Sequence, residues 1–446
     1  MIGPAYYFSA DGKDDDPKYE ISLAIPDFTD AKYGLLAGPT FTLVYATLIL
    51  FTGTLSDNYS RRFIFSISAI LWSFTSIGTA FSHSLVFLSL NRMLLGVFEA
   101  FAPPAAYSMI ADYFPPEKRT TANAVLSLGI FVGAGLASIT TIMIGWLGWR
   151  DTYFIVGCFG IVFGIIAMIF VKDPVRGRFD PKKVEEIKVL VTDEDEEQLD
   201  QPPPPKESLF KKYINGLGAL IRNDCTFWIL MGGMCRFWQG YTISYFCIKY
   251  FAIYKKPAEY GIANALCVLI GGFISNMFAG YISDKYEKVN YRTKSWVAVG
   301  MSAIGVPVSL ALFLVNASFG FSITMLFLDY LLCEGWISPS YAMIQAVIDV
   351  KYKGVAIGVF SFGTTISGTL AAVILGLVIT AEDAEEQQGL GEILAISTAI
   401  PCFLASLCFY RAGTFYVEFK KSFEEEKVKA MSIAVSHHVE LRSESI

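Results

Sequence analysis

The sequence predicts an all-α integral membrane protein, a helical bundle with about eleven transmembrane helices arranged in two halves. Three observations lead to this prediction: 54% of the 446 residues are hydrophobic, only 17% are charged, and long apolar runs recur along most of the chain. A soluble globular chain carries about 25% charged residues, so this composition is typical of a protein embedded in lipid. A run of about 20 apolar residues is long enough to cross a bilayer as a helix.

Eleven apolar runs have the length of a membrane-spanning helix. We expect helices at residues 33–56, 63–82, 85–112, 121–146, 151–171, 226–253, 259–283, 295–315, 318–348, 354–380 and 390–410. The N-terminal region, residues 1–32, is different, because its short apolar run MIGPAYYF is followed by SADGKDDDPKYE, which could not cross a bilayer. Residues 1–171 therefore form a first helical half, and residues 226–411 form a second.

Two polar segments accompany these halves. Residues 172–225 contain TDEDEEQLDQPPPPKE, whose acidic residues and prolines predict a solvated linker. The linker ends in SLFKKYINGLGALIRN, which predicts a short helix at the membrane surface. Residues 412–446 form a charged tail, in which FYVEFKKSFEEEKVK is predicted to be helical and the remainder irregular. Lysine and arginine are concentrated in alternate loops, and this bias predicts that the linker and the tail are both cytoplasmic.

The residue content argues against several classes of function. There is no basic stripe and no nucleic-acid recognition motif, so we expect no nucleic-acid partner. The eight cysteines lie mostly within apolar spans without a CxxC spacing, and the three histidines are scattered, so we expect no metal site and no cofactor. No nucleophile or nucleotide-binding motif is present, and we therefore do not expect an enzyme.

The third of these runs, residues 85–112, carries two charges among its apolar residues. Arg92 and Glu99 are seven residues apart, which places them on one face of a helix, two turns from each other. A charge in the middle of a membrane-spanning helix costs roughly 2.5–3.5 kcal/mol on scales of helix insertion into the membrane. Both side chains are therefore expected to face the bundle interior or a water-filled cavity. A structural ion pair between helices is one interpretation. A substrate or proton site is the other, and the remainder of the chain favours it.

The chain also repeats itself. Residues 53–59, GTLSDNY, match residues 280–286, GYISDKY, and residues 99–104, EAFAPP, match residues 334–339, EGWISP. In both copies an aspartate ends a helix and a glutamate interrupts a later apolar run. Two equivalent halves joined by a long linker are an expected architecture for a secondary transporter.

These motifs resemble those of the major facilitator superfamily. GTLSDNYSRR is similar to the signature loop between the second and third helices of that family through Gly53, Asp57, Arg61 and Arg62, although two other positions of the pattern differ. NRMLLGVFEA resembles the fourth-helix motif of the family. The run RMLLGVFEA…IADYFPPEKRTTANAV, followed by DPVRG, looks most like the Spinster-type branch. The family has twelve helices, so the resemblance implies that most of the first is missing here, and we expect a truncated gene model.

The resemblance also implies roles for particular residues. A cytoplasmic gate would include Gly53, Asp57, Arg61, Arg62 and Asp284, with Asp57 bonding the opposite half in one state and releasing it in the other. For Arg61 and Arg62, simple retention of the loop on the cytoplasmic side is an equal alternative. The fourth, seventh and tenth helices line a central cavity in the family. The charged residues on them, which would couple protons or bind substrate, are Arg92, Glu99, Arg236, Asp329 and Glu334.

We therefore expect a secondary active transporter, proton-coupled, for a small organic or amphipathic, lipid-like solute. Its partners would be that solute and the membrane lipids, and we expect a monomer. A non-transporting receptor or scaffold on the same fold is the alternative, and the retained carboxylates at Glu99 and Glu334 weigh against it. The sequence favours neither the plasma membrane nor an endolysosomal membrane.

Overall fold

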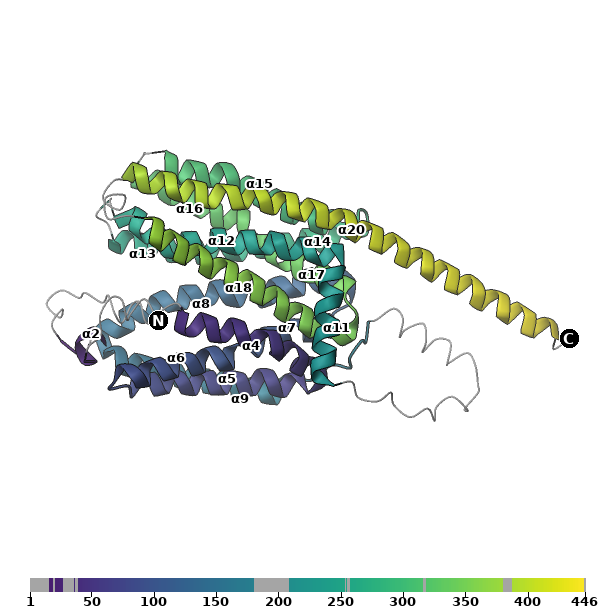
Figure 1. Cartoon of the computed structure of the whole chain (residues 1–446), viewed down its shortest axis with the longest axis horizontal. Coiled ribbons are helices and arrows are strands. Elements are labelled where there is room, and N and C mark those ends of the chain that lie inside the picture. The colour runs from purple at the N-terminus through teal and green to yellow at the C-terminus, as the bar shows by residue number, and fades with distance from the viewer. Residues whose placement is uncertain are drawn as a thin grey trace.

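The structure, a computed structural model, is a bundle of long helical rods. Each rod is either one helix or two or three consecutive helices that follow one another in line. It describes residues 16–18, 21–26, 36, 39–179, 208–252, 254, 257–315, 318–379 and 387–444, and no strand occurs among them. The rods run side by side along the long axis of the molecule, as Figure 1 shows. Large apolar side chains such as Trp146, Phe170 and Leu377 are more than 70% exposed on the outside of the bundle. Such a surface suits lipid contact, as expected for a multi-pass integral membrane protein.

The first half of the chain contributes five rods. They are α4 (Pro39–Asn58), α5 (Arg61–Ala80), α6 with α7 (Leu85–Glu99 and Ala102–Tyr113), α8 (Arg119–Leu147) and α9 (Trp149–Phe170). A single helical turn, α2 (Ile21–Ala24), precedes them, and the short 3-10 helix η1 (Pro116–Lys118) leads into α8.

The second half contributes six rods and a helix that leads into them. The rods are α12 (Asp224–Ala252), α13, η3 and α14 (Pro257–Leu266, Cys267–Gly271 and Gly272–Glu287), α15 (Thr293–Leu314), α16, η4 and α17 (Phe319–Cys333, Glu334–Trp336 and Ile337–Val347), α18 (Lys353–Val378), and α20 (Gln387–Glu444). The helix expected at the membrane surface is present as α11 (Leu209–Arg222), and η5 (Val350–Tyr352) precedes α18. The acidic and proline-rich centre of the linker lies outside the described residues.

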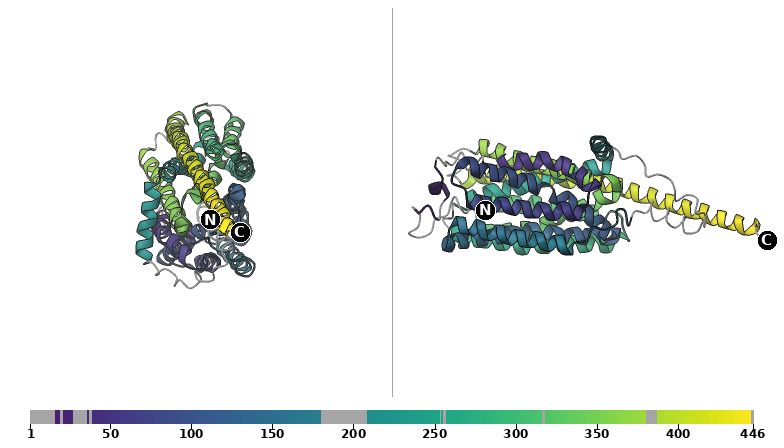
Figure 2. Two further views of the ribbon diagram at one scale, coloured as in Figure 1. Left: turned by 90° about the vertical axis from the view of Figure 1, so that its right-hand side faces the viewer. Right: turned by 90° about the horizontal axis from the view of Figure 1, so that it is seen from below.

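Each of the eleven predicted spans overlaps one of these rods. Ten of them are long and apolar enough to cross a membrane, counted over the described residues. The exception is α12, which is 29 residues long but carries Arg236 and Gln239 among its apolar residues. The prediction for the end of the tail is wrong, because α20 continues as one helix to Glu444, as Figures 1 and 2 show. The helix-forming residues after Lys429 extend the backbone hydrogen-bond pattern instead of ending it.

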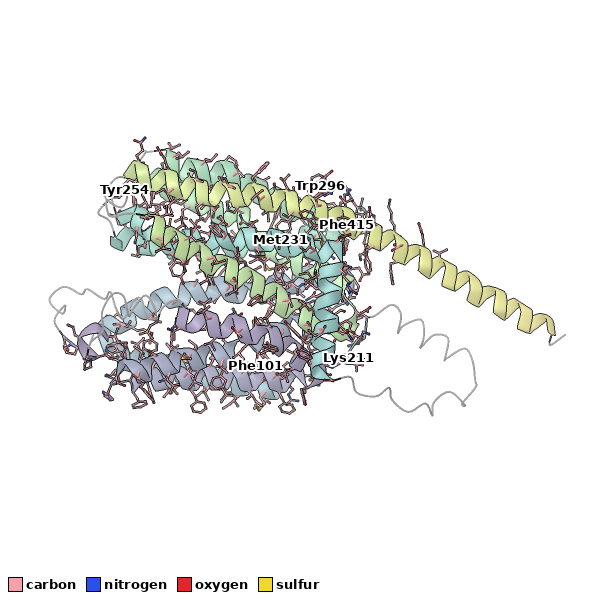
Figure 3. The ribbon with its side chains drawn as sticks, viewed as in Figure 1. Phe101, Lys211, Met231, Tyr254, Trp296 and Phe415 are labelled. Atoms are coloured by element: carbon pink, nitrogen blue, oxygen red, sulfur yellow. The ribbon has the colours of Figure 1, made fainter. Side chains whose placement is uncertain are left out.

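The two halves pack against each other along two helix pairs, α4 with α18 and α8 with α14. At one end of the bundle, α11 crosses the rods at a steep angle, and α20 projects beyond them, as Figures 1 and 2 show. Figure 3 labels Lys211 and Phe415 at this end and Tyr254 at the opposite end. We refer to the first of these as the α11 end.

Two rods are interrupted at equivalent places. The first rod breaks between Glu99, the last residue of α6, and Ala102, the first of α7; the second breaks over η4, which begins at Glu334. Prolines follow both breaks, at Pro103 in the first rod and Pro339 in the second. Proline lacks an N–H and its ring clashes with the preceding turn, so it ends a helix and starts another.

Candidate functional site

The first feature at the α11 end is a contact between the halves made by Asp57. Its carboxylate accepts hydrogen bonds from the backbone N–H groups of Gly354 at 2.9 Å and Val355 at 3.2 Å. These groups belong to the first turn of α18, where backbone N–H groups have no partner within the helix and the helix dipole favours a negative charge. Asp57 is only 7% exposed, so the contact is largely shielded from water. We call this the Asp57 contact.

A second contact repeats the first with the halves exchanged. The carboxylate of Asp284, near the end of α14, accepts hydrogen bonds from the N–H groups of Thr120 at 3.1 Å and Thr121 at 2.7 Å. These residues open α8, so a second-half aspartate caps a first-half helix. We call this the Asp284 contact. The sequence repeat thus appears in space as two reciprocal bonds between the halves.

Repeat-related glycines explain how the helices approach closely enough for these contacts. A side-chain Cβ at Gly53 on α4 would collide with the backbone carbonyl of Gly354 on α18. A Cβ at Gly280 on α14 would press on Ala124 and on the backbone of Thr121. Only glycine lets the two pairs of backbones pack at this distance.

Further inside, a polar layer joins the halves. The side-chain amide of Gln345 on α17 donates to the backbone carbonyl of Tyr107 on α7 at 2.8 Å, and Asn123 on α8 donates to Gln345 at 3.0 Å. The rings of Tyr107 and Tyr341 stack with centroids 3.7 Å apart. All four side chains are buried. Sequence analysis missed this layer, and Tyr341 lies one position short of the offset of 235 that relates Glu99 to Glu334.

Tyr107 and Tyr341 also have equivalent hydroxyl partners. The Tyr107 hydroxyl lies 3.0 Å from the Ser127 hydroxyl on α8, and the Tyr341 hydroxyl lies 3.4 Å from the Ser361 hydroxyl on α18. Each tyrosine is thereby held by a helix of its own half, while its ring stacks on the other half. The α11 end is closed by three successive layers, which are the two aspartate contacts, the amide pair and the stacked tyrosines.

The basic residues of the signature loop bond within the first half. Arg61 is 2% exposed and forms ion pairs with Asp112 at 2.5 Å and Asp173 at 3.1 Å. Arg62 donates from its Nε to the backbone carbonyl of Met168 at 2.8 Å. These bonds join α5 to α7, to α9 and to the segment that follows α9. Neither arginine has a second-half partner among the bonds found in the described part of the chain.

Of the charges predicted to line the cavity, Arg92 and Glu99 form a first cluster. Both line a cavity of about 310 Å³, whose walls come from α5, α6 and α9. Arg92 donates to the backbone carbonyl of Leu36 at 3.2 Å, and its guanidinium lies 5.3 Å from the ring centroid of Phe41. The described residues show no ion pair between Arg92 and Glu99. Glu99 therefore faces a cavity, with Arg92 near it but not bonded to it.

The remaining three charges form a second cluster, inside the other half. Arg236 is 1% exposed and pairs with Glu334 at 3.3 Å. The same guanidinium donates to the backbone carbonyl of Cys333 at 2.8 Å. Asp329, also 1% exposed, accepts weak hydrogen bonds of 3.3 and 3.4 Å from the side-chain amide of Gln239. The structure thus gathers the five predicted residues into two clusters, one in each half, with Glu99 and Glu334 at the two equivalent helix breaks.

A family model for the Major Facilitator Superfamily matches residues 21–372. The chain belongs to this superfamily. It therefore has the architecture of paired helical halves that the sequence predicts.

Curated relatives of the chain are transporters. An MFS-type efflux pump of Mycolicibacterium smegmatis is 22% identical over 87% of this chain and 86% of the pump. A probable sulfoacetate transporter of Cupriavidus necator is 21% identical over 81% of this chain and 83% of its own. A 4-hydroxybenzoate transporter of Acinetobacter baylyi is 20% identical over 76% of each chain. The chain is accordingly a secondary transporter by family and not an enzyme.

Solved structures agree on the fold. A bacterial homolog of the human lysosomal transporter Spinster, solved in an inward-facing and unoccupied conformation, aligns with a TM-score of 0.52 and 20% identity, over 89% of this chain and 91% of that chain. The human organic anion transporter MFSD10 aligns with a TM-score of 0.53 and 14% identity, over 86% of this chain and 87% of that chain. The predicted fold is thus confirmed.

Proposed function

We propose that the chain moves a small organic or amphipathic, lipid-like solute by alternating access, with proton coupling. The observation that carries this proposal is the reciprocal pair of contacts, Asp57 with α18 and Asp284 with α8. Both lie at the α11 end, which the distribution of lysine and arginine assigns to the cytoplasm. Each consists of hydrogen bonds to helix N-termini, which water can replace. They can therefore break and re-form as the halves rotate.

The solute class is inferred from the relatives and from the buried cations. Two relatives carry organic acids in their names, sulfoacetate and 4-hydroxybenzoate. Arg92 lies on the cavity between α5, α6 and α9, where a guanidinium can pair with a carboxylate or sulfonate through two parallel hydrogen bonds. The sequence motifs that resemble the Spinster-type branch support an amphipathic, lipid-like solute within the proposed class.

Proton binding is assigned first to Glu99. Burial disfavours a carboxylate charge that no cation compensates, and the described residues offer Glu99 no ion pair within 4 Å. Its repeat equivalent, Glu334, is paired with Arg236 at 3.3 Å. A movement that changes the distance between Arg92 and Glu99 would change the affinity of Glu99 for a proton, and this would link protonation to the access of the cavity. Asp329, bonded to a neutral amide, is the second candidate.

Transport by proteoliposomes with and without a pH gradient tests this assignment. Radiolabelled 4-hydroxybenzoate is the first probe. We expect Glu99→Gln to lose accumulation driven by the gradient and to keep exchange of solute across the membrane, because exchange needs no net proton movement. Glu425→Gln, at an exposed carboxylate of α20, is the matched control. Full gradient-driven accumulation by Glu99→Gln would contradict the role of Glu99, and Asp329→Asn would be measured next.

A further inference from the structure

A second cavity, unrelated to the charge clusters, opens at the α11 end beside the Asp284 contact. It has a volume of about 810 Å³ and lies between α7, the start of α8 and the end of α14. Its floor is apolar, with contributions from Ile110, Phe114, Val125, Leu126 and Tyr281. Val125 is 54% exposed and Tyr281 is 56% exposed, so the apolar wall faces outward between the helices. We call this the α8–α14 groove.

The rim of the groove is basic. Lys118, Lys285 and Lys288 line it on the side of the α11 end, and all three are exposed. The ammonium group of Lys285 lies 5.2 Å from the ring centroid of Tyr281. Two acidic residues, Glu117 and Asp284, also line the groove, and the Asp284 carboxylate accepts hydrogen bonds from the backbone N–H groups at the start of α8. Three positive and two negative charges thus line the groove, so a negatively charged group above the apolar floor meets a net positive charge.

The repeat-related crossing of helices on the other side of the bundle has a helical cover. The equivalent crossing in the other pair, α4 with α18, is covered by α11. Gly216 of α11 packs against Val355 and Tyr352, and the ring of Tyr213 lies 5.4 Å from that of Phe51. Figure 1 shows α11 lying over these helices at the end of the bundle. Among the described residues, no helix covers the α8–α14 groove in the same way.

We propose that the α8–α14 groove binds an anionic phospholipid of the cytoplasmic leaflet. Its acyl chains would cover the apolar floor of the groove, as α11 covers the equivalent crossing of α4 with α18. Its phosphodiester headgroup would lie among Lys118, Lys285 and Lys288. Basic pockets between transmembrane helices on the cytoplasmic side are suited to anionic headgroups, because the lipids of that leaflet carry negative charge. The occupant touches both halves, since α7 and α8 belong to the first and α14 to the second.

Native mass spectrometry of the purified full-length protein with dioleoyl phosphatidylserine or dioleoyl phosphatidylcholine tests the site. We expect the wild type to bind phosphatidylserine more tightly than phosphatidylcholine. Each lysine-to-glutamine change at Lys118, Lys285 or Lys288 should weaken phosphatidylserine binding about fivefold. The matched control is Lys351→Gln, an exposed lysine beside the Asp57 contact. Equal binding of the two lipids, or equal effects of the control and the groove variants, would overturn the proposal.

Two further arms separate a lipid site from a simple anion site. Val125→Trp places a large ring over the apolar floor and keeps every lysine, so it should weaken binding of the intact lipid. Soluble glycerophosphoserine should bind far more weakly than the lipid to the wild type. Glycerophosphoserine binding as tight as that of the lipid would overturn the assignment of a phospholipid. So would a Val125→Trp protein that is folded, by its melting temperature, and binds the lipid normally.

The lipid has a consequence for conformation that rests on the proposed alternating access. Since the groove exists only while α8 and α14 are together, bound phosphatidylserine should slow hydrogen exchange at Thr120 and Thr121 relative to phosphatidylcholine. Exchange that is unaffected by a lipid shown to bind would overturn this state preference. The wild type could instead transfer labelled phosphatidylserine across the bilayer, with the transfer lost in the lysine variants. That result would make the groove a path for substrate and would overturn the proposal of a lipid that stays bound there.

Discussion

Asp57→Asn is the sharpest perturbation of the closed α11 end. The change removes the charge and one acceptor oxygen but preserves the shape of the side chain. Two backbone N–H groups now donate to this carboxylate, those of Gly354 and Val355. The side-chain oxygen of asparagine can still accept a hydrogen bond, but its NH2 group replaces the second carboxylate oxygen and can only donate. At least one charge-assisted bond is lost, together with the favourable interaction between the charge and the start of α18.

The magnitude follows from the bonds that are lost. A hydrogen bond to a charged group contributes roughly 1.5–3 kcal/mol. This contact exists only while the halves are closed at the α11 end, so its loss shifts the closed-to-open equilibrium by the same amount. A shift of that size corresponds to roughly a ten- to hundredfold change in the equilibrium constant.

Hydrogen exchange measured by mass spectrometry reads this shift at the donors themselves. If the halves move as rigid bodies, Asp57→Asn should accelerate exchange in the peptides at the starts of both α18 and α8, because opening breaks the Asp284 contact as well. Faster exchange at α18 alone would indicate local fraying and not a gate. Asp224→Asn removes the same charge from an exposed site and is the matched control. Exchange rates within twofold of the wild type at both helices would refute the reasoning.

Two further predictions concern the stability and approach of the helices. Arg61→Ala leaves the buried Asp112 carboxylate without its 2.5 Å partner, so we expect destabilisation of about 3–5 kcal/mol and a lower melting temperature in a detergent thermal-shift assay; a melting temperature equal to that of the wild type would exclude a structural role for the pair. Gly53→Ala places a Cβ against the Gly354 carbonyl, so we expect a folded protein that stays open at the α11 end, with fast exchange at α18 and slow transport; normal exchange and transport would show that the backbones can separate without cost.

The sequence predicts the rods well because their determinants are local. Apolar length defines each span. The breaks beside Glu99 and Glu334 are not among these predictions, because the sequence predicts unbroken helices over 85–112 and 318–348, and the structure divides both where prolines follow. The repeat identifies Asp57 and Asp284 as equivalent. The spans need only the neighbouring residues, and each of them corresponds to an element of the structure, whereas the repeat is found by comparing the two halves.

The partners of these residues could not be predicted in the same way. Asp57 bonds an amide that lies 297 positions further along the chain, and a backbone N–H leaves no mark in the sequence. Gln345 and Asn123 are neutral polar residues in apolar runs, so they resemble many side chains that bond only within their own helix. Their pairing depends on how the halves dock. The same reason applies to Arg61, whose charge indicates a loop but whose position is buried.

The breaks and the closed end are mechanically connected in this architecture. Glu99 ends α6, and Tyr107 lies on the short helix α7 that begins three residues later. Glu334 opens η4, and Gln345 lies on α17, which follows it directly. Helices of 12 and 11 residues are about 16–18 Å long and rigid over that length. Under the proposed function, a change of charge or an incoming solute at either break would therefore tilt α7 or α17 as a unit. Because these two helices meet through Gln345 and the stacked tyrosines, a tilt of either one acts directly on the polar layer that holds the halves together.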